Sequence, residues 1–245
     1  MEMQFLTKSY AQTCATRVVE SGEGWLRCQE TVFYPQGGGQ LGDTGKVIVG
    51  DGSQLIIVNT LKGGEIGQVV HYLQDKSCVL PVGLQVNLIL DWQRRYQFMQ
   101  LHTALHVLSA VLPFPVTGCQ INETSARIDL ACPELTLTKE EITKQLNDFC
   151  CANYVVSVEQ LPEELLQKQL ELVKTMSVKP PAGVGNIRMI RIDSIDYQPC
   201  GGTHVANTGE IPALVVSNIK SKGKQNRRVT ICFAEEPKVL GLHCE

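Results

Sequence analysis

The sequence predicts an α+β protein in which a small N-terminal β-barrel precedes a mixed domain with a mostly antiparallel sheet. Residues 1–92 alternate short β-rich runs with glycine and aspartate turns and show no convincing long helix. A helical pattern of apolar residues then begins near Tyr96, and later strand-like runs alternate with two further helical segments. We therefore assign a β-barrel domain to residues 1–92 and an α+β domain to residues 93–245.

Short β-rich runs predict the strands of the barrel. Each run ends near glycine or aspartate, and their regular spacing is typical of a small closed sheet. The runs are WLRCQETVFYP, GKVIVGDG, SQLIIVNTLKGG, GQVVHYLQD and VNLILDW.

An amphipathic helix opens the second domain. Apolar residues recur at the spacing of one helix face, at Phe98, Leu101, Leu105, Leu108 and Leu112. Pro113 ends the helix. His102 and His106 lie one turn apart beside the apolar stripe, so we expect their imidazoles to project side by side.

The rest of this domain mixes strands and helices. ARIDLAC is typical of a strand, and Thr138 with Glu141 forms a capping box that predicts a helix to about Asn153. VVSVEQL predicts a strand, Pro162 opens a helix to about Thr175, and SVKPPAGVG is a predicted loop. IRMIRID, ALVVSNI and RRVTICFAE complete the sheet.

Composition indicates a soluble globular protein. With 245 residues and 43% hydrophobic content, the chain can bury a full core. No apolar run approaches the span of a membrane, and MEMQFLTKSYAQ lacks the basic and apolar blocks of a signal peptide. The ten cysteines are scattered and form no disulfide framework. We therefore expect reduced thiols and a cytoplasmic location.

Two pairs of possible metal ligands stand out. His102 and His106 form an HxxxH pair, and Cys200 and His204 form a second pair in the glycine-rich loop CGGTH. A lone HxxxH is more often two hydrogen-bonded core histidines, and a lone CxxxH is more often a buried free cysteine. Together they supply the four ligands that zinc requires, and their nitrogen and sulfur donors favour zinc.

The segment YPQGGGQLGDTG is too rich in glycine for the interior of a regular strand. It lacks the lysine of a phosphate-binding loop and the helix that follows a dinucleotide fingerprint, which excludes both interpretations. At Gly37, Gly38 and Gly39 we predict a bulged strand or turn that another backbone or a substrate approaches closely. A flexible loop is the alternative.

The net charge of −3 gives no global attraction to nucleic acid, so an RNA partner would need a local basic patch. Such a patch is predicted at a hairpin around Gly223, where five cations cluster: Lys220, Lys222, Lys224, Arg227 and Arg228. These cations could contact a phosphate backbone, and an ordinary solvated hairpin is an equally good interpretation.

Three motifs, in this order, resemble the AlaX family of freestanding alanyl-tRNA editing proteins. They are YPQGGGQLGDTG, DWQRRYQFMQLHTALHVLSAVL and CGGTH followed by the basic hairpin. The same elements are similar to the editing domain of alanyl-tRNA synthetase. The resemblance covers nearly the whole chain, including the barrel of the medium-length class. It implies that residues 93–245 form an editing domain, and the lack of an ATP-binding core implies editing without aminoacylation.

The resemblance also implies a site and a reaction. Zinc would be held by His102, His106, Cys200 and His204 beside the 3′ end of a mischarged tRNA(Ala), from which serine or glycine is removed by hydrolysis. Leu105 departs from the synthetase pattern, which often has threonine there. Thr117 and Gln120 match a polar stretch near the family's substrate pocket, so they are candidates for binding the substrate and for assisting a zinc-positioned water.

Two other functions stay open. In the first, the protein is a zinc-stabilised RNA-binding module in which four protein ligands close the metal shell and no hydrolysis occurs. In the second, it is a metal-dependent hydrolase of small esters or amides. The second ranks last, because Thr103, Ala104 and Leu105 between the histidines provide no glutamate base.

Overall fold

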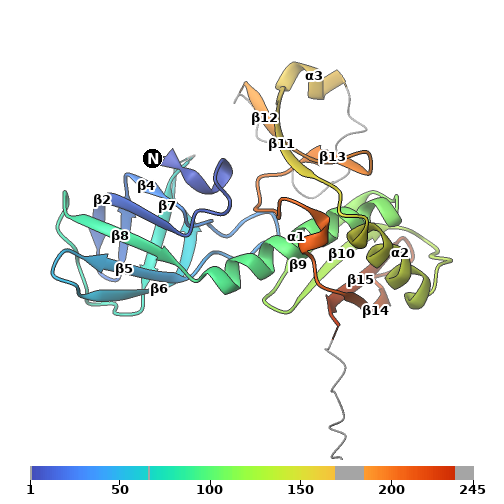
Figure 1. The fold of residues 1–245 in the computed structure, drawn as a ribbon, viewed down its shortest axis with the longest axis horizontal. Coiled ribbons are helices and arrows are strands. Elements are labelled where there is room, and N and C mark those ends of the chain that lie inside the picture. Colours follow the sequence, from blue (N-terminus) through green and yellow to red (C-terminus); the bar gives the residue numbers. More distant parts are fainter. Residues whose placement is uncertain (1, 66, 169–184, 235–245) are drawn as a thin grey trace, which may run out of the picture.

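The computed structural model describes residues 2–65, 67–168 and 185–234 (Figure 1). A closed barrel lies at one end of the molecule, and a long helix leads from it into a second part built of two sheets and shorter helices. The predicted α+β class with an N-terminal barrel and mostly antiparallel pairing is confirmed. Among the described residues, no helix is long and apolar enough to cross a membrane.

The barrel closes in the order β2-β3-β7-β6-β5-β8. Its strands are β2 (Thr13–Gly22), β3 (Trp25–Cys28), β5 (Gly45–Val49), β6 (Gln54–Lys62), β7 (Val69–Leu73) and β8 (Gln85–Leu90). Alternate residues point inward, as in β8, where Val86, Leu88 and Leu90 join the barrel core. Three elements of the N-terminal part stand outside the barrel order. They are β1 (Glu2–Met3) and β4 (Glu30–Thr31), which form a short parallel pair, and the 3-10 turn η1 (Gln4–Leu6).

The second part contains two separate antiparallel sheets. One has the order β14-β15-β10-β9 and is made of β9 (Val116–Ile121), β10 (Ser125–Ala131), β14 (Leu214–Ser221) and β15 (Asn226–Phe233). The other has the order β11-β12-β13 and is made of β11 (Val156–Pro162), β12 (Asn186–Ile192) and β13 (Asp196–Pro199). The helical elements are α1 (Trp92–Val111), α2 (Lys139–Cys151), α3 (Glu163–Lys168) and the 3-10 turn η3 (Thr208–Glu210).

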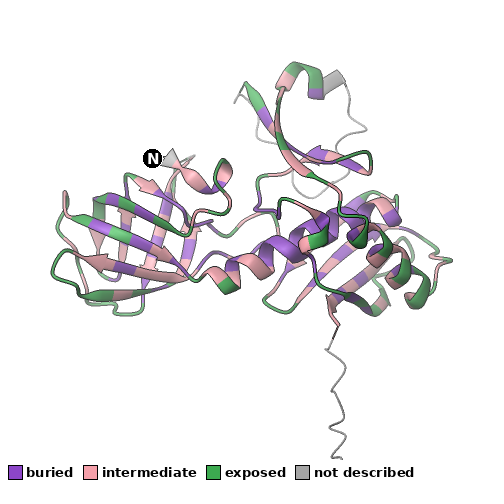
Figure 2. Ribbon diagram, viewed as in Figure 1, coloured by how far each residue is buried: buried purple, intermediate pink, exposed green. Residues whose placement is uncertain are grey.

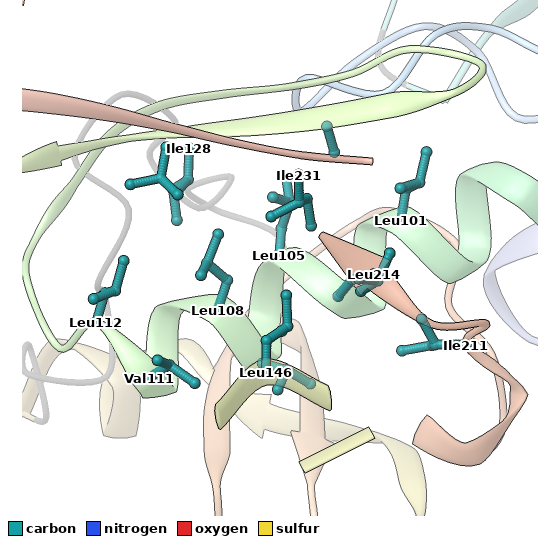
Figure 3. Close-up of a cluster of buried hydrophobic side chains, with 14 of the residues drawn as sticks. Leu101, Leu105, Leu108, Val111, Leu112, Ile128, Leu146, Ile211, Leu214 and Ile231 are labelled. Atoms are coloured by element: carbon teal, nitrogen blue, oxygen red, sulfur yellow. The ribbon is translucent and has the colours of Figure 1, made fainter. Parts of the chain in front are cut away.

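Helix α1 is the central element of the second part. Most of its residues beyond Tyr96 are buried (Figure 2). Figure 3 shows its leucines packed against the inner face of the four-stranded sheet and against α2, with Leu105 and Leu108 near Ile231 and Leu146. The barrel strands end at Leu90 and the helix begins at Trp92, and we propose a domain boundary between residues 92 and 93.

The structure corrects two sequence expectations for the second part and confirms a third. Helix α1 begins at Trp92, four residues before the apolar pattern starts, because the Asp91 carboxylate caps it by accepting a hydrogen bond from the Arg94 N–H. IRMIRID lies in β12 of the smaller sheet and does not join the four-stranded one. The predicted capping box at Thr138 is present. The predicted helix beyond Lys168 and most of the SVKPPAGVG loop lie outside the described residues.

A buried ion pair joins the glycine-rich segment to α1. Arg95 is fully buried, and its Nε lies 3.0 Å from each carboxylate oxygen of Asp43. Arg95 also donates to the carbonyl of Val32 at 2.7 Å, and Asp43 accepts the backbone N–H of Tyr34. Both charges therefore have several hydrogen-bond partners, as burial requires.

Replacing Arg95 with methionine should lower the free energy of unfolding by about 3–5 kcal/mol, because it leaves the Asp43 carboxylate buried without its partner. Urea denaturation measures the change. Arg191→Met is the matched control, since its ion pair with Glu159 is about 40% exposed and should contribute at most about 1 kcal/mol. Equal effects of the two substitutions would contradict a special role of the buried pair.

Candidate metal centre

Four possible metal ligands converge between α1 and the loop that follows β13. His102 and His106 come from α1, and Cys200 and His204 come from the loop. One ligand atom from each residue lies within 4.8 Å of the others. The Cys200 Sγ is 3.4 Å from the His102 Nε2 and 3.6 Å from the His204 Nε2. The structure thus brings together the four residues that the sequence singled out.

Helix and loop geometry explain this convergence. The two histidines of α1 are one turn apart, and their ring centroids are 5.5 Å apart. The loop is held against β12 by Arg188, which donates to the carbonyls of Cys200 and Gly202. Gly202 leaves no room for a side chain, because a Cβ there would lie 2.1 Å from the His102 Cε1. Glycine is therefore required where the loop passes the helix.

The segment after His204 is held by a carboxylate. Glu210 accepts hydrogen bonds from the hydroxyls of Tyr10 and Tyr96 and from the backbone N–H of Ala206. One of these tyrosines precedes the barrel and the other lies on α1. The position of the loop is therefore tied both to the N-terminal residues and to the helix.

The two histidines of α1 each have an orienting partner. His106 Nδ1 lies 2.8 Å from the Asp196 carboxylate, which also accepts a hydrogen bond from Gln198. His102 Nδ1 lies 2.9 Å from the side-chain oxygen of Gln40. Sequence reasoning assigned no role of this kind to any of the three partners. The available signal was the alternation of Asp196 and Gln198 on the strand that leads into CGGTH.

Charge in the cluster favours a thiolate at Cys200, a neutral imidazole at His204 and a protonated imidazole at His106. Burial raises the pKa of the Cys200 thiol, but the neighbouring His102 and His204 rings lower it well below its usual value. Burial lowers the pKa of His204 to about 3. Burial also opposes the charged form of His106, yet its hydrogen bond with Asp196 and its contact with Cys200 raise its pKa to about 9.

These residues fit a divalent metal ion. Three imidazoles and one thiolate are the donor types of tetrahedral zinc sites, and the three histidines are at most 6% exposed. His204 is the least restrained of the four, because its Nδ1 is buried without a hydrogen-bond partner among the described residues. A metal at this position would supply the positive charge that the buried thiolate attracts.

The glycine-rich segment lies along the edge of β9. Gly37 and Gln40 exchange backbone hydrogen bonds in a turn, and the N–H of Ile121 donates to the carbonyl of Gly39. A Cβ on Gly39 would lie 2.7 Å from the Cys119 carbonyl oxygen, so only glycine permits this approach. The segment is thus a turn that another backbone approaches closely, as one sequence interpretation held.

The two candidate substrate-binding residues of β9, Thr117 and Gln120, form hydrogen bonds with side chains of other strands in the same sheet. Gln120 pairs with Arg127 across the sheet, and its amide oxygen accepts hydrogen bonds from that guanidinium. The Thr117 hydroxyl donates to the side chain of Asn226, the first residue after the hairpin turn. The side chain of β9 that reaches the glycine-rich segment is instead Cys119, whose Sγ is 3.4 Å from the Gly38 carbonyl oxygen. Sequence reasoning missed this cysteine.

The five cations of the basic hairpin divide into two groups. Arg228 makes a two-pronged ion pair with Asp129, and Arg227 donates to the carbonyls of Pro133 and Gly223. The lysines differ, because their side chains are exposed and show no hydrogen bond or ion pair within the described part of the chain: Lys220, Lys222 and Lys224. The lysines are therefore the cations available to a polyanion.

Comparison with known proteins decides the family. The alanyl-tRNA editing protein AlaX-M of Saccharolobus solfataricus is 33% identical over 93% of this chain and 97% of its own length. This chain belongs to the AlaX family. The AlaX-M protein of Methanosarcina acetivorans is 31% identical over 81% of the chain and 84% of its own length. The alanine–tRNA ligase of Sulfurisphaera tokodaii is 35% identical over 86% of the chain, but over only 24% of its own length.

Two family models agree with this membership. The model described as the second additional domain of threonyl and alanyl tRNA synthetases matches residues 187–230, which contain the CGGTH loop. The model of class II (A) tRNA synthetases matches residues 1–94, which contain the barrel and the glycine-rich segment. Both ends of this AlaX chain are therefore related to synthetase sequences.

Gly202→Ala should abolish tight binding of a divalent metal, because the added methyl group displaces the His102 ring. Cobalt titration measures this through the absorption band of a thiolate-bound ion. Gly201→Ala is the matched control, since a Cβ added at Gly201 would have no atom within 4 Å, and it should bind cobalt normally. Normal cobalt binding by Gly202→Ala would show that the loop does not require glycine at this position.

Proposed function

We propose that this protein is an aminoacyl-tRNA deacylase that removes serine or glycine from mischarged tRNA(Ala) at a zinc site. The ligands would be His102, His106, Cys200 and His204. The observation that carries the proposal is the convergence of these four side chains in a chain whose relatives are named alanyl-tRNA editing proteins. The partner would be the acceptor end of tRNA(Ala).

The chemistry required is modest, because an aminoacyl ester is already activated. Hydrolysis needs a positioned water, stabilisation of the oxyanion and exclusion of the correct alanyl ester. A bound zinc ion would supply Lewis acidity and a fixed point for water or the substrate amine. His204 is the ligand best able to yield a coordination position, because its Nδ1 has no hydrogen-bond partner among the described residues to orient the ring.

Selectivity would depend on polar groups that face the amino acid. A pocket that hydrogen-bonds the seryl hydroxyl rejects alanine, because alanine leaves the protein's polar groups unpaired, whereas glycine is accepted for its size. We propose Gly38 and Cys119 as neighbours of such a pocket, because the Cys119 Sγ contacts the Gly38 carbonyl in the segment whose Gln40 reaches His102. It favours Thr117 and Gln120 less, since their side chains are engaged by Asn226 and Arg127.

The second candidate function is RNA binding without hydrolysis. It is favoured by one observation, namely that all four protein ligands lie close enough to complete a tetrahedral shell. In that case the metal would only stabilise the fold. A metal-loaded protein that binds tRNA(Ala) but leaves its ester intact would support this function and contradict deacylation.

Purified protein should contain about one zinc per chain and should release serine or glycine from mischarged tRNA(Ala) while sparing alanyl-tRNA(Ala). Cys200→Ala and His106→Ala should each lower the zinc content and reduce the rate of deacylation at least about 100-fold. Metal analysis and release of labelled amino acid measure the two effects. Full zinc content in a Cys200→Ala, His204→Ala double variant would refute the site.

A Lys220→Ala, Lys222→Ala, Lys224→Ala variant should bind tRNA more weakly and with a shallower salt dependence. The slope should fall by about 0.7 to 0.9 per phosphate contact removed, because each lysine releases counterions when it binds. Zinc content should not change. A Lys8→Ala, Lys76→Ala, Lys144→Ala variant is the charge-matched control. If both variants bind alike, the hairpin is a solvated turn and the RNA surface lies elsewhere.

A further inference from the structure

We infer that Gln40 is a positioning residue through which the glycine-rich segment of the barrel domain sets the tautomer and orientation of the His102 ring in the metal centre. The inference rests on the proposed metal site and deepens the proposed function, because it assigns the glycine-rich segment a role in building that site. Gln40 is 1% exposed and lies 62 residues before His102 in the chain.

The side chain of Gln40 connects both halves of the ligand set. Its Oε1 lies 2.9 Å from the His102 Nδ1 on α1, and its Nε2 donates to the Thr203 hydroxyl in the CGGTH loop at 3.0 Å. The backbone N–H of Thr203 also points to Oε1, at 3.4 Å. A single amide therefore contacts the helix that carries two ligands and the loop that carries the other two.

These contacts fix which atom of the amide faces the histidine. A backbone N–H can only donate, so the amide atom that faces the Thr203 N–H must be the oxygen. The same oxygen faces the His102 Nδ1, and an amide oxygen has no proton to give. Nδ1 must therefore carry the hydrogen, which leaves the lone pair of a neutral ring on Nε2. Nε2 is the atom that lies 3.4 Å from the Cys200 Sγ.

Contacts between the glycine-rich segment and the second part of the molecule hold Gln40 in this position, on both of its sides. On one side, Gly39 approaches the Cys119 backbone more closely than a residue with a Cβ could, and Gln40 itself bridges to Ile121. On the other side, the Asp43 carboxylate pairs with Arg95, which lies two helical turns before His102. The segment therefore runs along α1, with Asp43 opposite Arg95 and Gln40 opposite His102.

The Nδ1 atoms of the three histidines thus lie in three different surroundings. A carboxylate, Asp196, accepts from His106, whereas a neutral amide accepts from His102 and no partner faces the His204 Nδ1 in the described residues. A neutral acceptor fixes the tautomer without adding negative charge next to Cys200. Orienting partners of this kind change metal affinity about 10- to 100-fold when they are removed.

The test measures zinc affinity by competition with a chelator, without tRNA. Gln40→Met keeps the approximate volume and removes both hydrogen-bonding atoms, and it should weaken zinc binding about 10- to 100-fold. Gln40→Glu restores an acceptor for the His102 Nδ1–H and should recover most of the lost affinity. Gln36→Met is the matched control, because it makes the same change at an exposed position of the same segment whose side chain forms no hydrogen bond within the described residues.

Nitrogen-detected spectroscopy of the histidine rings in the unmodified, zinc-loaded protein provides a second measurement that needs no variant. The His102 proton should be on Nδ1 and should exchange slowly with water. A His102 proton on Nε2, or a Gln40→Met affinity within about twofold of Gln36→Met, would overturn the inference. Deacylation is measured separately, so a protein that binds zinc but leaves the ester intact would contradict the proposed function and not the role of Gln40.

Discussion

The ion pair between Arg95 and Asp43 is the contact on which the arrangement of the site depends. It fastens the segment after the glycine turn to the start of α1, with both charges out of water and hydrogen-bonded. Because α1 is continuous, the ion pair that fixes the position of Arg95 also fixes the positions of His102 and His106 relative to the glycine-rich segment. A flexible tether between the barrel and the second part would not place a barrel side chain against a ligand to within hydrogen-bond distance.

Steric and electrostatic constraints act together at the cluster. Glycine at position 39 lets the glycine-rich segment approach β9, glycine at position 202 lets the loop approach α1, and a side chain at either position would displace a neighbour. The closeness brings a buried thiol among three imidazoles, where its ionised form is favoured. Desolvating such groups is unfavourable unless opposite charge is nearby. The same packing that defines the fold therefore creates a strong preference for a cation.

The sequence predicted those elements whose determining residues lie close together in the chain. Five barrel strands follow from short β-rich runs between turns, the helix α2 from the capping box at Thr138, and the histidine pair from its spacing on α1. The barrel strand β2 was not predicted. Strand β9 was missed because Gly118 and its polar neighbours interrupt any apolar alternation. Contacts such as Gln40 with His102 and Arg228 with Asp129 join residues far apart in the chain, and they follow from the tertiary register, which no short pattern encodes.

The wide separation of the site residues also has a consequence for biosynthesis. Every strand of the barrel lies within residues 13–90, so the barrel can fold as soon as this stretch has left the ribosome. The helix histidines emerge next, but Cys200 is synthesised 98 residues after His102. During this interval the two histidines and Gln40 have been synthesised while the thiolate is still missing. A nascent chain would thus pass through a stage with an incomplete ligand set, in which weakly held metal can still exchange before the last segment closes the centre.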